Sequence, residues 1–186
     1  MGYSRAQKLE SHERILDLAA KQIKERGLES ISIDDLMKRA GLTKGAFYAH
    51  FPSRDTLLLE ATKRAKEIPQ KLLRDIAETK RKLSLADVID VYLSEQHINN
   101  PGHGCVVCAL ASEAKSATEA IRTELSENYK GQVDFVAKAL TGKSIRARAI
   151  GILSALMGAV SLARTFNDPE LVQSRDPQFR RSRLRC

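Results

Sequence analysis

The chain has 186 residues, of which 42% are hydrophobic and 29% are charged, and it contains three cysteines. This length suits one good core or a small domain fused to a larger one, the composition argues against disorder, and the odd cysteine count argues against a secreted disulfide framework. The net charge of +8 lies towards the two ends: residues 1–66 carry 13 Lys and Arg against 9 Asp and Glu, and residues 175–186 carry 5 against 1, which favours an anionic partner held mainly at one end.

The N-terminal stretch MGYSRAQKLESHER lacks the apolar run of a signal peptide, and no apolar run approaches the length that crosses a membrane. We therefore expect a soluble cytoplasmic protein without a membrane partner. Turn signals fall at spacings that suit helices, and strand-like alternation is nearly absent. The sequence thus predicts an all-α fold.

The first helix is expected over residues 6–26, and Gly27 suits its C-terminal cap. Apolar residues at helical spacing form one face of it, namely Leu9, Ile15, Leu16, Ala19 and Ile23. A short second helix follows Ser32, an N-cap with Asp35 three positions later, and ends before Gly41.

A third helix is expected over residues 44–50, with Thr43 as its cap and Pro52 blocking its continuation. Ser53 then caps a fourth, longer helix. Two short capped helices joined by a three-residue turn with a glycine have the dimensions of a helix-turn-helix. This signal is strong, because two consecutive capped helices of this length are rare in a generic helical bundle.

The second part of the chain is also expected to be helical. Pro69 is expected to interrupt or kink the fourth helix. The elements beyond it are a helix over 85–98 capped by Ser84, a loop over 99–104, a short helix over 106–116, long helices over 118–140 and 144–165, and a last turn over 168–172.

The segment GLTKGAFYAHFPSRDTLL, preceded by SIDDLMKRA and AAKQIKERG, resembles the DNA-binding domain of the TetR family of transcriptional regulators. The resemblance includes the turn glycine, the Thr-Lys-Gly opening, the Tyr-x-His-Phe ending and the Ser-Arg-Asp-x-Leu start of the next helix. It implies a helix-turn-helix DNA-binding domain over 1–52 and a helical ligand-binding and dimerisation domain over 53–174. The excess of arginine marks residues 175–186 as a separate basic tail.

A recognition helix enters the major groove by its N-terminal end, which puts residues 43–46 nearest the bases or the flanking phosphates. Tyr48 and His50 are predicted to face outward towards phosphates, although the His50 ring can instead cap a helix end. Phe47 and Phe51, four residues apart, are predicted to pack inward. Together with the resemblance, this gives the predicted DNA contacts Ser32, Thr43, Lys44, Gly45, Ala46, Tyr48, His50 and Arg54.

The resemblance also implies a homodimer formed by the last two long helices, which binds a pseudo-palindromic operator on double-stranded DNA. Small residues recur every fourth position at Ala147, Gly151 and Ala155, and permit close helix packing. The apolar area in the same helix is expected from Ile152, Leu156 and Val160. Packing inside a monomer is the competing interpretation.

A further implication of the resemblance is a small-molecule effector that enters a helical cavity and moves the DNA-binding domains apart, so that a repressor leaves its operator. A helical pocket has no linear sequence signature. The candidate lining residues are Tyr92, His97, Leu110 and Phe135.

Cys105 and Cys108 form a C-x-x-C pair. A structural zinc site usually adds a second ligand pair, and a thioredoxin-like enzyme needs a preceding strand; neither is evident. The sequence favours two small buried residues and leaves open a regulatory thiol pair with Cys105 at a helix N-terminus, which oxidants or electrophiles attack.

Catalysis has little support in the sequence. No Ser/His/Asp arrangement, phosphate-binding glycine loop or H-E-x-x-H motif is present. We therefore expect no enzymatic activity, no cofactor and no metal, with a C-x-x-C thiol oxidoreductase as the remaining enzymatic alternative.

Overall fold

The computed structural model describes residues 5–79 and 83–166, and within these ranges every regular element is helical. The all-α prediction is confirmed. The α-helices are α1 (Arg5–Arg26), α2 (Ile33–Arg39), α3 (Phe47–His50), α4 (Arg54–Glu78), α5 (Leu85–Tyr92), α6 (Glu95–Asn99), α7 (Val106–Leu110), α8 (Glu119–Ala137) and α9 (Ile145–Thr165). The expected turn over 168–172 and the basic tail over 175–186 lie outside the described residues.

The chain divides into two compact units. The first unit combines Met1–Ile68 with Gly102–Asn128, and the second combines Pro69–Pro101 with Tyr129–Cys186. The N-terminal helices thus share a unit with the segment that contains the C-x-x-C pair, a grouping that the sequence did not indicate.

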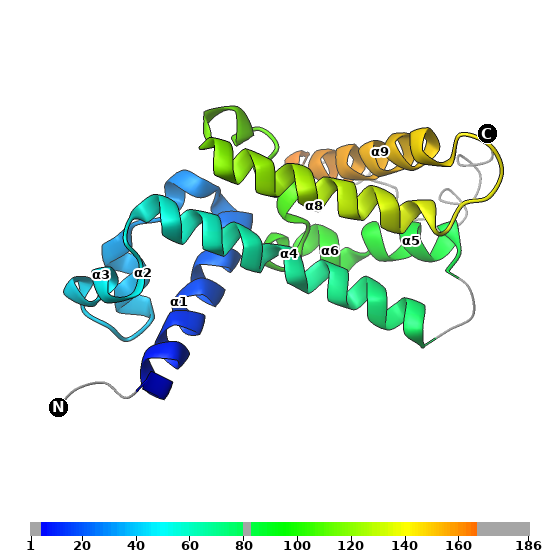
Figure 1. Cartoon of the computed structure of the whole chain (residues 1–186). Helices are drawn as coiled ribbons and strands as arrows, with labels where there is room; N and C mark the ends of the chain where they lie inside the picture. The colour runs from blue at the N-terminus through cyan, green and yellow to red at the C-terminus, as the bar shows by residue number, and fades with distance from the viewer. Residues whose placement is uncertain (1–4, 80–82, 167–186) are drawn as a thin grey trace. The chain divides into compact units, whose positions relative to one another are not determined.

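The core of the first unit is built around α1, which lies beside α2 (Figure 1) and also contacts α7. Ile15, Ala19 and Ile23 are fully buried, as their helical spacing predicts. The predicted inward packing of Phe47 and Phe51 is also confirmed, since both rings are inaccessible to solvent. Apolar side chains from beyond residue 100 complete the same core, namely Val106, Leu110, Ile121 and Leu125.

Local capping explains where the short helices begin. The Ser32 hydroxyl accepts a hydrogen bond from the Asp35 amide at 3.5 Å, and Ser53 accepts from the Thr56 amide at 3.1 Å. Both predicted caps are confirmed. Thr43 stands at the N-cap position of a 3₁₀ turn over Lys44–Ala46, but its side chain makes no capping bond within the described chain, so the predicted Thr43 cap is not formed.

The expectation of one continuous helix over residues 85–98 is wrong. The predicted helix over 85–98 is divided, because the Ser94 hydroxyl accepts from the His97 amide at 3.2 Å and starts α6 as a separate helix. The expected interruption of the fourth helix at Pro69 does not occur, because α4 continues to Glu78; a kink at Pro69 stays a prediction. A proline removes only one amide donor, and the remaining bonds of a long helix can hold it together.

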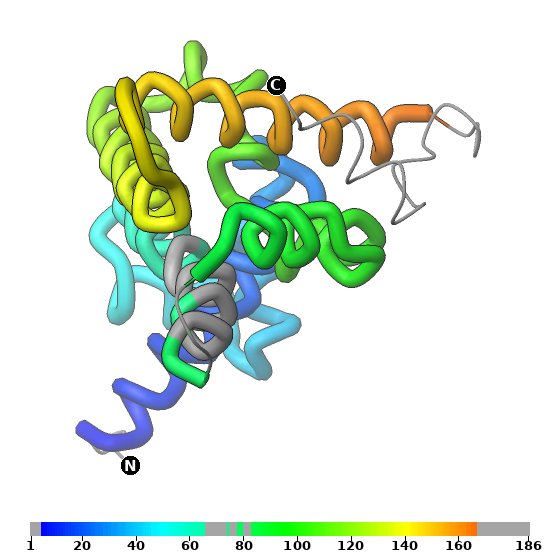
Figure 2. The backbone as a smooth tube through the Cα atoms, turned by 90° about the vertical axis from the view of Figure 1, so that its right-hand side faces the viewer, coloured from blue at the N-terminus to red at the C-terminus, as the bar shows by residue number. Residues whose placement is uncertain are grey.

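In the second unit α9 contacts α5 and α6 (Figure 2). Arg164, in the last turn of α9, donates to the carbonyls of His97 at 2.6 Å and Ile98 at 3.1 Å. These are among the last carbonyls of α6, which have no partner inside that helix. The guanidinium therefore fastens the end of α6 to α9.

α9 is largely apolar, but little of it is buried within the part of the chain that the structure describes. By length and composition it could cross a membrane, so the expectation that no apolar run reaches that length is wrong; only 22% of its most apolar stretch is buried. Helices at the interior or subunit interface of soluble proteins meet the same criteria. Leu156 and Val160 are buried within the chain, which contradicts their assignment to a dimer surface. Ile150 and Leu162 are exposed instead.

Candidate nucleic-acid interface

The turn between α2 and α3 has a defined geometry. Gly41 adopts a left-handed φ of 73°, its amide donates to the Lys38 carbonyl at 3.0 Å, and the Leu42 amide donates to the Met37 carbonyl at 2.9 Å. These two bonds make a Schellman motif, which ends α2 and redirects the chain. The motif, α2 and α3 together form a helix-turn-helix with a short second helix.

The outer surface of α3 and of the 3₁₀ turn before it presents the Tyr48 hydroxyl next to small residues. Tyr48 is 73% exposed and lies edge-on against the buried Phe47 ring, with centroids 5.2 Å apart. Gly45 and Thr43 are exposed and Ala46 is half-buried. A Cβ added at Gly45 would meet nothing within 4 Å in the described chain. The fold therefore does not explain the glycine at this position, whereas close approach of an external partner would.

Lys44 is held by a neighbour that the sequence analysis missed. Its ammonium lies 2.8 Å from the Asp34 carboxylate of α2, and both side chains are exposed. The hydrogen bond and the charge of Asp34 raise the pKa of Lys44 above its ordinary value. Lys44 thus remains a cation, and its contact with DNA stays a prediction.

His50 lies beside a second histidine. Its Nδ1 is buried and finds no hydrogen-bond partner among the described residues, and its ring lies 6.1 Å from the ring of His12. Burial, His12 and Lys8 lower the pKa of His50, in that order of importance. The neutral ring retains one N–H donor. A phosphate contact by His50 stays a prediction.

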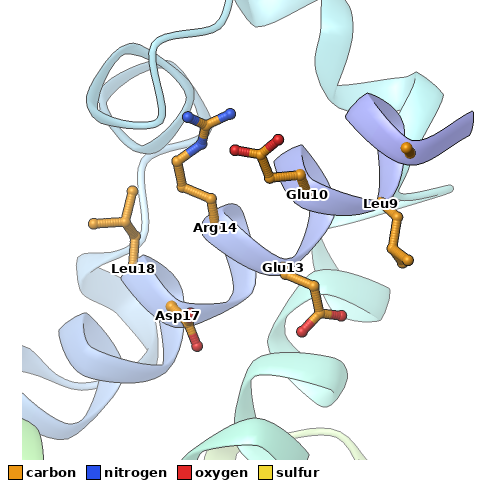
Figure 3. A pocket seen from close by; sticks show the side chains of 7 residues that line it. Leu9, Glu10, Glu13, Arg14, Asp17 and Leu18 are labelled. Carbon is orange, nitrogen blue, oxygen red and sulfur yellow. The ribbon is translucent and has the colours of Figure 1, made fainter. Parts of the chain in front are cut away.

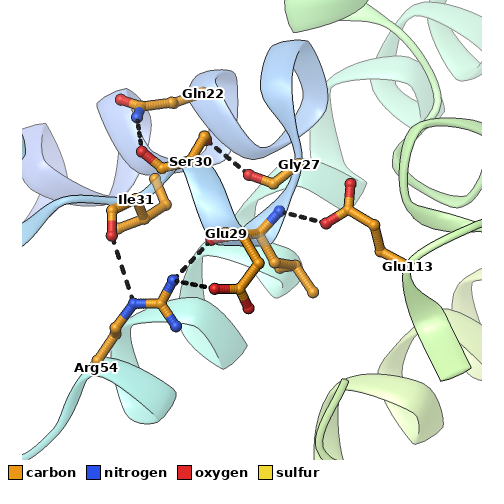
Figure 4. A network of polar contacts seen from close by, with 8 residues as sticks. Gln22, Gly27, Glu29, Ser30, Ile31, Arg54 and Glu113 are labelled. Carbon is orange, nitrogen blue, oxygen red and sulfur yellow. Dashed lines mark hydrogen bonds and ion pairs between the residues drawn. The ribbon is translucent and has the colours of Figure 1, made fainter. Parts of the chain in front are cut away.

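Arg54, also predicted as a DNA contact, is engaged inside the protein (Figure 4). Its guanidinium donates to the Leu28 carbonyl at 3.0 Å and the Ile31 carbonyl at 3.4 Å, and it lies 3.5 Å from the Glu29 carboxylate. The start of α4 is thereby tied to the turn before α2. Ser32, at the end of that turn, is exposed. DNA contacts by Arg54 and Ser32 stay predictions.

The four predicted effector-binding residues do not form one cluster. Tyr92 and His97 meet in the second unit, with ring centroids 4.8 Å apart and the His97 Nδ1 2.6 Å from the Tyr92 carbonyl oxygen. Phe135 belongs to the same unit and is half-buried. Leu110 is instead part of the core of the first unit. Their role in effector binding stays a prediction.

An open depression lies on one side of α1 and includes none of those four residues (Figure 3). Its lining residues are Ala6, Leu9, Glu10, Glu13, Arg14, Asp17 and Leu18. Leu9 is among the exposed large apolar residues, so its assignment to the core face is wrong. It lies in the N-terminal turns of α1, before the first buried residues of that helix.

The C-x-x-C pair lies at the start of α7. Cys105 occupies the N-cap position and is buried, Cys108 is half-buried, and neither forms a disulfide. Lys24 of α1 is only 3% exposed, and its ammonium interacts electrostatically with Cys105 but has no hydrogen-bond partner among the described residues. Burial lowers the pKa of Lys24 to about 8. In the described part of the chain, no group of three or more His, Cys, Asp or Glu is placed to hold a metal.

Comparison with known proteins identifies similar sequences for the helix-turn-helix. The sequence model described as "Bacterial regulatory proteins, tetR family" matches residues 15–61. The regulator YvdT of Bacillus subtilis is 43% identical over 47 residues, which are 25% of this chain and 24% of YvdT. The regulator Rv0196 of Mycobacterium tuberculosis is 29% identical over 168 residues, which are 84% of this chain and 85% of Rv0196. These relatives are named as transcriptional regulators, and no enzyme family is indicated.

Solved structures share the fold over nearly the whole chain. The reduced form of Escherichia coli NemR superimposes with a TM-score of 0.72 and 19% identity, covering 87% of this chain and 91% of NemR. A TetR transcriptional regulator from Legionella pneumophila gives a TM-score of 0.73 and 20% identity, covering 92% and 94%. At these identities the likeness concerns the fold alone.

Proposed function

The chain belongs to the TetR family of transcriptional regulators, and we propose that it is a cytoplasmic, dimeric repressor that a small molecule releases from a pseudo-palindromic operator. The observation that carries this proposal is the outward surface of residues 43–48. There an exposed phenol, a cation and a glycine that the fold does not require stand together at the start of a recognition helix.

Each of these residues has a distinct task in the proposed complex. Gly45 and Ala46 let the backbone approach the base edges and leave room for a thymine methyl group. Lys44 contacts a guanine acceptor or a phosphate, and Tyr48 donates its hydroxyl proton to a phosphate oxygen. Phosphate contacts position the helix, and base contacts select the sequence.

Dimerisation is proposed through α8 and α9. Ala147, Gly151 and Ala155 all lie at exposed positions of α9, where a second copy can approach closely. Ile150 and Leu162 add exposed apolar area to the same helix. Covering these residues removes apolar surface from water. Two copies then read two half-sites about one helical turn of DNA apart, or a multiple of that spacing.

Selection from random double-stranded DNA tests the proposed function. The purified chain should enrich an inverted repeat, and absence of any enriched sequence would overturn the proposal. Gly45→Ala is the test variant for close approach to DNA, because it adds one methyl group that meets no atom of the described residues within 4 Å. We expect this variant to keep the thermal stability of the wild type and to lose affinity for the selected operator.

A second candidate function is thiol-based sensing by a regulator of the same fold. The observation that favours it is the position of Cys105 at the N-cap of α7, three residues before Cys108 and in electrostatic contact with the buried Lys24 ammonium. Hydrogen peroxide would oxidise Cys105 to a sulfenic acid with release of water, and condensation with the Cys108 thiol would release a second water and form a disulfide.

Peroxide treatment distinguishes the two candidates. Under thiol sensing, peroxide weakens operator binding by the wild type and has no effect on Cys105→Ser. Unchanged operator affinity of the treated wild type would reject this second candidate and leave the first intact.

A further inference from the structure

Leu28 lies in the turn between α1 and α2, and side chains from distant parts of the sequence bind both its amide and its carbonyl (Figure 4). Leu28 donates its amide proton to the Glu113 carboxylate at 2.8 Å, and its carbonyl accepts from Arg54 at 3.0 Å. Glu113 stands 85 positions further along the chain. Both backbone groups of this one residue are therefore satisfied by charged side chains, which make stronger hydrogen bonds than neutral groups do.

The carboxylate of Glu113 lies directly against the backbone of the turn. A Cβ placed on Gly27 would come within 2.0 Å of Glu113 Oε1, and Gly27 also has a left-handed φ of 83°. Side chains other than glycine disfavour that φ. Glycine therefore suits position 27 for two reasons, the left-handed φ and the close approach of the Glu113 carboxylate. The second reason depends on Glu113.

Glu113 is itself carried by a segment that is anchored in the core of the first unit. Val106 and Leu110 of α7 are buried there, and the Glu113 amide donates to the Leu110 carbonyl at 3.1 Å. A displacement of α7 along α1 therefore moves the Glu113 carboxylate relative to the Leu28 amide. The C-x-x-C pair lies at the start of the same helix.

The turn that Glu113 holds leads directly into the helix-turn-helix. Within the turn, the Ser30 hydroxyl donates to the Gly27 carbonyl at 2.7 Å, and Gln22 of α1 donates to the Ser30 carbonyl at 2.8 Å. Arg39, at the end of α2, donates in turn to the Gln22 side chain. These hydrogen bonds, together with the backbone between Gly27 and Ser30, link Glu113 to Arg39 at the end of α2.

We infer that Glu113 is a positioning residue that couples the segment over 105–116 to the DNA-reading helices. Its bond to Leu28 holds the turn in the conformation that supports operator binding, and loss of the bond releases the start of α2. The DNA readout of this inference rests on the proposed function. The hydrogen bond and its effect on the turn do not.

The test compares Glu113→Ala and Glu113→Gln with the wild type, and uses Glu119→Ala as a control at an exposed carboxylate in the first turn of α8. Amide hydrogen exchange at Leu28 reports the bond without DNA, and titration of the selected operator reports binding by the folded protein. We expect Glu113→Ala to raise Leu28 exchange and to weaken operator affinity, each by about tenfold, since a hydrogen bond to a charged group is lost. Glu113→Gln retains an acceptor oxygen and should restore most of the Leu28 exchange protection and most of the operator affinity.

Three outcomes would overturn the inference: unchanged Leu28 exchange in Glu113→Ala, no rescue by Glu113→Gln, or a lower melting temperature with operator affinity of the folded fraction unchanged. The last outcome assigns Glu113 a merely structural role. If Glu113→Ala does not fold, Glu113→Asp is used in its place in both measurements. Its side chain is one methylene shorter, which moves the carboxylate away from the Leu28 amide. If the wild type selects no operator, the proposed function fails, while Leu28 exchange still decides whether Glu113 holds the turn.

Discussion

α1 and α9 are helices of nearly equal length, with 22 and 21 residues, but their apolar residues have opposite surroundings. Ile15, Ala19 and Ile23 of α1 are completely buried by other parts of the same chain. In α9, Ile150 is 40% and Leu162 is 55% exposed. Helical spacing of apolar residues therefore predicts that a face is to be covered, but it does not say whether the same chain or a second copy covers it.

We expect substitutions in the two helices to affect different properties of the protein. α1 is surrounded by the helix-turn-helix on one side and by α7 on another, so changes in its contacts should affect folding and the pose of the recognition helix. α9 leaves apolar residues to solvent, so changes there should affect association between copies and spare the fold. Substitutions in the core around α1, in α9 and on the outer face of α3 test these expectations, in order of decreasing expected effect.

The largest effect is expected for Phe47→Ala, which removes a ring from the core around α1. Truncation of a fully buried phenylalanine costs about 3–5 kcal/mol of stability. Urea unfolding followed by circular dichroism measures the loss. Tyr48→Ala is the matched control, since the adjacent ring is mostly exposed and its removal should change stability by roughly 0.5 kcal/mol or less. Equal losses in the two variants would contradict the inward and outward placement of these rings.

The next effect concerns the charge that α1 buries. Lys24 has a pKa lowered from 10.5 to about 8 by burial, so its protonated form costs roughly 3 kcal/mol of folding stability below pH 8. Because the unfolded chain binds the proton more tightly, this cost disappears as the pH rises from about 8 to 10.5.

Lys24→Met should remove this pH dependence. Urea unfolding at pH 7 and at pH 10 is compared for the two proteins, so that other titrating groups cancel. The wild type should gain more stability, relative to the variant, at the higher pH. An equal change in both proteins would show that the Lys24 ammonium is not destabilised by its surroundings.

A smaller effect on affinity, and none on folding, is expected for Ala155→Arg in α9. A charged side chain at this exposed position of the proposed interface should convert the dimer to a monomer, which lowers operator affinity by about a hundredfold through loss of bivalent binding. Analytical ultracentrifugation gives the oligomeric state. Ala6→Arg, at an exposed position of α1, should leave it unchanged. A monomeric wild type, or a variant that remains dimeric, would move the interface away from this part of α9.

Much of the first unit could be predicted because its signals are local. The hydroxyls of Ser32 and Ser53 lie three residues from the amides they cap, and Phe47 and Phe51 lie four residues apart, at the first residue and at the C-cap of α3. The Lys44 ion pair with Asp34 joins residues 10 positions apart on different elements, so it depends on how the turn aims them. No periodicity reports such a contact.

The contacts and burial that the sequence did not predict depend on tertiary packing. Nothing near Glu113 in the sequence points to Leu28, since the bond exists only once α7 lies against α1. Likewise, the spacing of Leu156 and Val160 matches that of the exposed α9 residues, and only the positions of neighbouring helices decide which face is covered. Sequence patterns thus locate helices and caps, and leave the choice of partner to the fold.

The smallest effect is expected for Tyr48→Phe, which separates positioning of the recognition helix from sequence reading. The variant keeps the edge-on contact with Phe47 and loses only the hydroxyl group. Loss of one phosphate hydrogen bond should weaken binding by about threefold to tenfold, and by the same factor for the selected operator and for unrelated DNA. Fluorescence anisotropy with both DNAs at one salt concentration measures the two factors. A loss confined to the operator would instead place the Tyr48 hydroxyl at a base edge, and α3 would then read sequence through an aromatic side chain as well as through its small residues.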